Sequence, residues 1–106
     1  MSKPHTFFNV INFPEGKEDE AFAAWQAIGR FMETQKGFLG STLYRNRRNP
    51  LMFINRGSYE SEDSFLACVK SGEFQKLSAK LTELGVERIA GLYDELESFR
   101  GYDAAS

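Results

Sequence analysis

The fold is decided between residues 53 and 65, which have the sequence FINRGSYESEDSF. The first half has the apolar and aromatic residues typical of a strand, but it includes Asn55, a residue type depleted in strands. Ser61 is placed to cap a helix, and Glu62 and Asp63 fall in its first turn, where the helix dipole favours negative charge. The segment therefore predicts a strand that runs directly into a helix and carries a polar side chain within the sheet.

Periodic apolar patterns on both sides of this segment predict the other elements. In chain order, the expected strands and helices are residues 6–13, 17–35, 38–45, 51–59, 61–70 and roughly 89–99. A further helical turn or two is expected between Phe74 and Leu84, ended by Gly85. The order β-α-β-β-α-β, with right-handed crossovers, predicts an α+β fold of the ferredoxin-like, split βαβ sandwich type.

A four-stranded antiparallel sheet of this type has helices on one face only. Alternation along the strands places Phe8, Val10, Met52 and Ile54 on the other face. This set is too apolar to remain in contact with water. Two sheets packed face to face would cover it, so the sequence predicts a homodimer that forms a dimeric α/β barrel.

Composition limits the class of protein. The 106 residues, with a net charge of -2, suit a single domain over residues 1–106, with a frayed tail at about 101–106, and no nucleic-acid partner. No run is apolar enough for a membrane span or a signal core, so we expect a cytoplasmic protein. Cys68 is the only cysteine and His5 the only histidine. They predict no internal disulfide and no metal site, and Cys68 is expected to be a small core residue.

The chain resembles the antibiotic biosynthesis monooxygenase (ABM) family of dimeric α/β barrels over nearly its whole length. The resemblance rests on Gly37-Phe38-Leu39 leading into Leu43-Tyr44-Arg45, on Tyr59 to Phe65, on Ser71-Gly72-Glu73-Phe74 and on Gly91-Leu92-Tyr93. It implies a cofactor-independent monooxygenase that acts on a small aromatic or quinol-like substrate. The alternative is a non-catalytic dimer of the same fold that binds a small ligand or is associated with stress.

Two branches of this family can be compared with the sequence. The haem-degrading branch has an Asn on its first strand, matched by Asn9, but Cys68 and Ser78 stand where it has a Trp and a His. Without that His, haem has no evident ligand, so haem degradation is not expected. The branch that oxidises polycyclic phenols has an Asn followed closely by a Trp on its third strand. Asn55 matches that Asn, and Tyr59 takes the place of the Trp.

Asn55, Tyr59 and Asn9 are therefore the candidate catalytic residues. If the open face carries Phe8 and Ile54, all three polar side chains point toward the helices from neighbouring central strands. Amide and phenol groups can stabilise an oxyanion, and this chemistry needs no cofactor. The expected walls of the substrate site are Phe22, Trp25, Phe53 and Phe65.

The two asparagines also have a structural interpretation. Each amide could satisfy backbone groups at a bulge, or the two could bond to each other. A pocket of ligand size with convergent donors would favour the oxygenase, whereas an interface filled by Phe and Trp side chains would favour the non-catalytic dimer.

Overall fold

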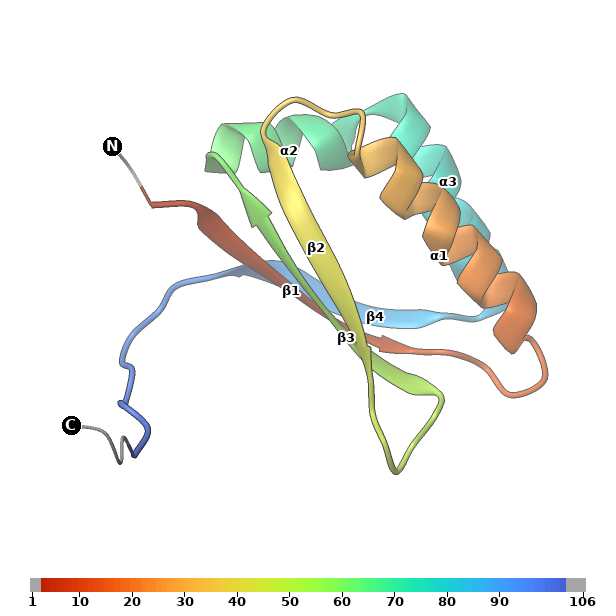
Figure 1. Ribbon diagram of the computed structural model, residues 1–106. Helices are drawn as coiled ribbons and strands as arrows, with labels where there is room; N and C mark the ends of the chain where they lie inside the picture. Colours follow the sequence, from red (N-terminus) through yellow and green to blue (C-terminus); the bar gives the residue numbers. More distant parts are fainter. Residues whose placement is uncertain (1–2, 103–106) are drawn as a thin grey trace.

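The computed structural model describes residues 3–102 of the chain. Its elements, in chain order, are β1 (His5–Asn12), α1 (Glu18–Met32), β2 (Phe38–Arg45), β3 (Met52–Tyr59), α2 (Glu62–Lys70), α3 (Gly72–Leu84) and β4 (Glu87–Tyr93). Figure 1 shows α1, α2 and α3 on the same face of the sheet, and the described residues place no helix on the other face. The predicted α+β ferredoxin-like fold is confirmed.

The strands form one antiparallel sheet in the order β2-β3-β1-β4. As expected, β1 and β3 are neighbours at the centre. Their register places Asn9 directly opposite Asn55 and Val10 opposite Ile54. Asn9 and Asn55 are buried while Ile54 is exposed, so the two amides lie on the helix-covered face and Ile54 on the open face.

Local capping chemistry sets the helix boundaries. The Ser64 backbone N–H donates to Ser61 Oγ at 3.1 Å, which confirms the predicted cap of α2. Ser71 then caps α3 in the same way, with the Phe74 N–H donating to its Oγ at 3.2 Å. Gly85 ends α3 with a φ of 91°, in the left-handed region. With 13 residues, α3 is longer than the turn or two expected from the sequence.

The prediction for the last strand was wrong at both ends. β4 begins at Glu87, opposite Asn12, and ends at Tyr93, opposite Thr6. A strand needs a partner for its backbone groups, and β1 supplies none beyond this point. The apolar residues after Tyr93 instead belong to no regular element: Leu96, Phe99 and Tyr102 are 94%, 86% and 95% exposed. Most of the predicted tail, residues 103–106, lies outside the described residues.

The core fills the space between the helices and the sheet. Ile11 and Leu81 are fully buried there, and Cys68 is buried beside them as a free thiol, in the core position expected for it. None of the helices within residues 3–102 is long and apolar enough to cross a membrane.

Candidate functional site

A cavity of about 70 Å³ lies between the helix-covered face of the sheet and the helices; we call it the inner cavity. The sheet contributes Phe7, Asn9, Phe38, Ser41, Asn55, Gly57, Tyr59 and Arg88 to its lining. The helices contribute Trp25, Ile28, Gly29, Met32, Val69 and Phe74. All three candidate catalytic residues therefore line the same cavity.

Asn9 and Asn55, on neighbouring strands, both line the inner cavity. Asn9 and Asn55 are each only 6% exposed, and they are direct cross-strand partners. Asn9 Oδ1 is buried and accepts no hydrogen bond from residues 3–102. Leaving such an oxygen unpaired costs about 1–3 kcal/mol, so a donor entering the cavity would be stabilised there.

The structural interpretation of Asn9 gains no support from this geometry. The register between β1 and β3 is continuous through Asn9 and Asn55, and the irregularity in the sheet falls at Phe38 and Gly40, between β2 and β3. Asn9 Oδ1 therefore satisfies no bulge, and it accepts nothing from the Asn55 amide. Polar groups without a protein partner are concentrated where water or a ligand supplies one.

Tyr59 is one of the aromatic residues that line the inner cavity. Its ring packs against Phe65, Phe38 and Phe7, with centroid separations of 5.1, 5.6 and 6.1 Å. Burial, and to a smaller extent the nearby Cys68, raises the pKa of Tyr59 above its ordinary value. The phenol therefore stays protonated near neutral pH, where it can donate a hydrogen bond but cannot act as a base.

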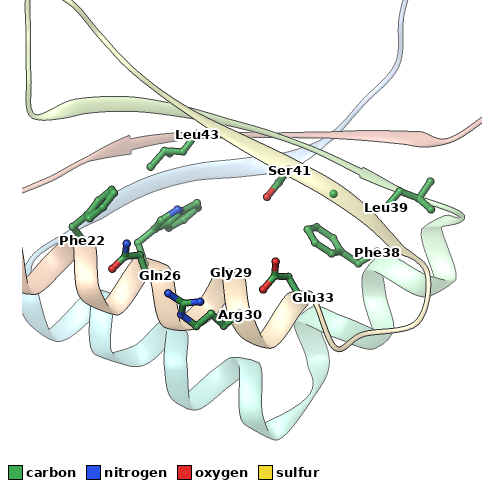
Figure 2. A pocket seen from close by; sticks show the side chains of 11 residues that line it. Phe22, Gln26, Gly29, Arg30, Glu33, Phe38, Leu39, Ser41 and Leu43 are labelled. Carbon is green, nitrogen blue, oxygen red and sulfur yellow. The ribbon is translucent and has the colours of Figure 1, made fainter.

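A larger hollow of about 670 Å³, which we call the outer groove, runs between α1 and β2 (Figure 2). Its lining is Phe22, Trp25, Gln26, Gly29, Arg30, Glu33, Phe38, Leu39, Gly40, Ser41 and Leu43. Trp25, Gly29, Phe38 and Ser41 line both spaces, so the inner cavity adjoins the groove. Small-molecule sites usually enclose about 300–1,000 Å³. The groove has that size, whereas the inner cavity has room for only one end of a ligand.

Of the four aromatic residues expected to form the walls of the site, only Trp25 and Phe22 line the inner cavity or the outer groove. Trp25 lines both spaces, and Phe22 lines the outer groove and is 42% exposed. Phe65 packs behind Tyr59 and does not line the inner cavity. Phe53 packs on Phe13, at a centroid separation of 4.6 Å, and also lies outside this lining.

Sequence reasoning did not single out Arg88, whose side chain lines the inner cavity. The predicted strand began at Ile89, so Arg88 was not assigned to a face of the sheet. The face on which Arg88 lies follows from its pairing with Ile11, which is fully buried, and this pairing could not be read from the sequence. In the described part of the chain, no three His, Cys, Asp or Glu side chains gather into a potential metal site.

Comparisons with known proteins agree with this architecture. The family model described as antibiotic biosynthesis monooxygenase matches residues 4–80. SnoaB, a cofactor-independent oxygenase from Streptomyces nogalater, superposes with a TM-score of 0.82 at 21% identity, over 94% of this chain and 100% of its own. A proposed monooxygenase from Shewanella loihica PV-4 has a TM-score of 0.72 at 28% identity, over 92% of this chain and 99% of its own. A comparison with curated proteins finds no match.

Proposed function

The chain belongs to the antibiotic biosynthesis monooxygenase family, and from this we propose that it is a cofactor-independent monooxygenase acting on a small aromatic or quinol-like substrate. The observation that carries the proposal is the buried pair of Asn9 and Asn55, with an unpaired amide oxygen, in a cavity that adjoins a groove of ligand size. The similarity to SnoaB supports the same class of reaction.

The proposed binding mode uses both spaces. The aromatic body of the substrate lies in the outer groove against Trp25 and Phe22, and its oxygen-bearing end enters the inner cavity. There the Asn55 amide N–H donates to the substrate oxygen, assisted by the Tyr59 hydroxyl. Asn9 Oδ1 accepts a hydrogen bond from a substrate hydroxyl, which removes the cost of leaving this oxygen unpaired.

The chemistry then relies on the substrate's own electrons. An electron-rich phenolate or enolate transfers an electron to O₂, and the two radicals combine to form a carbon–oxygen bond. The resulting peroxide loses water, so a substrate such as an anthrone gives a quinone with consumption of one O₂ and release of one H₂O. The protein contributes by fixing the anion, stabilising its charge and excluding bulk water.

The experiment is to follow oxygen uptake with a panel of anthrones and quinols, without any added cofactor and with a metal chelator present. We expect at least one member to be oxidised at a rate proportional to protein concentration, with one O₂ consumed per molecule. If no member is oxidised faster than without protein, the non-catalytic ligand-binding dimer becomes the better account.

We also propose that the chain forms a homodimer through the open face of its sheet. That face exposes Tyr44, Ile54, Ile89 and Tyr93, and in Figure 1 residues 94–102, which follow β4, lie on the same side. A two-fold pairing is the commonest way to cover such a surface.

Light scattering at micromolar concentration should therefore return twice the 12.1 kDa chain mass. Ile54→Glu places a charge at the centre of the open face and should shift the protein toward monomer. Ala27→Glu, on the exposed side of α1, is the matched control and should leave the mass unchanged. A parent protein that stays monomeric under these conditions would refute the dimer.

A further inference from the structure

Arg88 is a half-buried cation in the wall of the inner cavity, and the binding mode described above gives it no role. It lies on β4 opposite Ile11, on the helix-covered face of the sheet. From there its side chain reaches α3. It is the one charged side chain among the described residues that line the inner cavity.

The guanidinium is held from one side. Arg88 Nη1 donates to Ser78 Oγ at 2.9 Å, and Nη2 donates to the Ser78 carbonyl oxygen at 3.3 Å and to Thr82 Oγ1 at 2.8 Å. These three bonds use three of the five guanidinium N–H groups. The Nε–H and one Nη1–H remain available, and their orientation is fixed because the planar group is anchored to α3.

The charge of Arg88 is not balanced by these contacts. All three acceptors are neutral oxygens of Ser78 and Thr82, and no carboxylate is among them. Burial lowers the pKa of Arg88, but a guanidinium remains charged throughout the physiological range. A partly desolvated cation without a counter-ion favours an anion beside it.

We propose that Arg88 binds the negatively charged oxygen of the ligand, so that the inner cavity selects aromatic compounds in their anionic form, as phenolates, enolates or carboxylates. The N–H groups that α3 leaves free are the donors. The neutral amides of Asn9 and Asn55, which line the same cavity, then orient the anion, and the positive charge of Arg88 balances its negative charge.

The positive charge of Arg88 also explains how a substrate would lose its proton. Of the described residues that line the inner cavity, none is a carboxylate or a histidine, and Tyr59 stays protonated. A nearby positive charge lowers the pKa of a bound phenol or enol. The proton can therefore leave to water as the substrate binds, without a side-chain base. This consequence rests on the proposed oxygenase function, whereas anion binding does not.

The test compares two probes of nearly the same shape, 1-naphthoate and the neutral 1-naphthamide, by isothermal titration calorimetry. We expect the parent protein to bind 1-naphthoate about tenfold or more tightly than 1-naphthamide, because hydrogen bonds to charged groups are the stronger ones. Arg88→Gln should lose this preference, and Arg88→Lys should keep part of it. Arg48→Gln removes a positive charge from the exposed β2–β3 hairpin and should retain the full preference.

Equal affinity of the parent protein for the two probes would overturn the proposal, and so would an Arg88→Gln variant that folds and retains the preference. If Arg88→Gln does not fold, the proposal is tested instead by following the NMR resonance of the Arg88 Nε–H in the parent protein. It should move on addition of 1-naphthoate and stay in place with 1-naphthamide, and the opposite result refutes the assignment. Oxygen uptake is measured separately. If the protein prefers the anionic probe but oxidises no anthrone, the proposal of an anion site stands and the proposed oxygenase function is refuted.

Discussion

Replacing Asn55 by Ala is expected to lower the rate of substrate oxidation about a hundredfold or more, which is the usual effect of removing an oxyanion donor. Asn55 lies in a central strand, buried and directly opposite Asn9, so no neighbouring amide can take its place without moving the sheet. The measurement is oxygen uptake with the best member of the anthrone and quinol panel, together with the melting temperature of each variant.

The melting temperature separates the catalytic from the structural interpretation of this amide. In the catalytic interpretation, Asn55→Ala remains as stable as the parent within a few degrees while turnover is lost. Asn12→Ala serves as the control, because Asn12 lies on β1 with its side chain on the other face of the sheet. A folded Asn55→Ala variant with the parent's oxidation rate would remove this residue from the site. A large loss of stability with unchanged activity per folded molecule would make it structural.

A larger side chain at position 29 is expected to raise stability and lower activity. Gly29 lies within α1 and lines both the inner cavity and the outer groove, and a Cβ added there meets nothing within 4 Å. Gly29→Leu should stabilise the helix by about 0.5–1 kcal/mol, since glycine is a poor helix former. The same side chain would occupy the space where the ligand passes, so oxidation and 1-naphthoate binding should fall tenfold or more, an effect of the order of 1.4 kcal/mol.

Ala27→Leu is the matched control for this variant, because Ala27 is exposed on the same helix and does not line either space. It should change neither binding nor oxidation. Thermal unfolding and calorimetry measure the two effects independently. If Gly29→Leu is stable and still binds 1-naphthoate with the parent's affinity, the outer groove is not the route to the inner cavity.

The sequence predicted most of the fold because its signals are local. The Ser61 cap, the acidic first turn of α2 and the alternation along β1 and β3 depend only on neighbouring residues, and the structure reproduces all three. The prediction failed at Leu96 and Phe99 for a physical reason. An apolar segment forms a strand only where another strand can pair with it, and the pairing between β4 and β1 stops at Tyr93, opposite Thr6.

The site was predictable in part for a related reason. Alternation along each strand predicts the face on which Asn9 and Asn55 lie, but the exact pairing of the two depends on the register between β1 and β3. The role of Arg88 depends on contacts with Ser78 and Thr82 of α3, which no short-range pattern encodes. Phe53 and Phe65 were expected to be walls of the site because they are aromatic, yet packing places them outside the cavity lining.

The proposed site is tested most directly by following the side-chain amide resonances of the ¹⁵N-labelled protein during titration with 1-naphthol. We expect the signals of Asn9 and Asn55 to shift together and to saturate with the same affinity. The signals of Asn46 and Asn49, in the exposed hairpin, should stay in place. If 1-naphthol binds and shifts other resonances but leaves the Asn9 and Asn55 amide signals in place, the two residues do not form the ligand site.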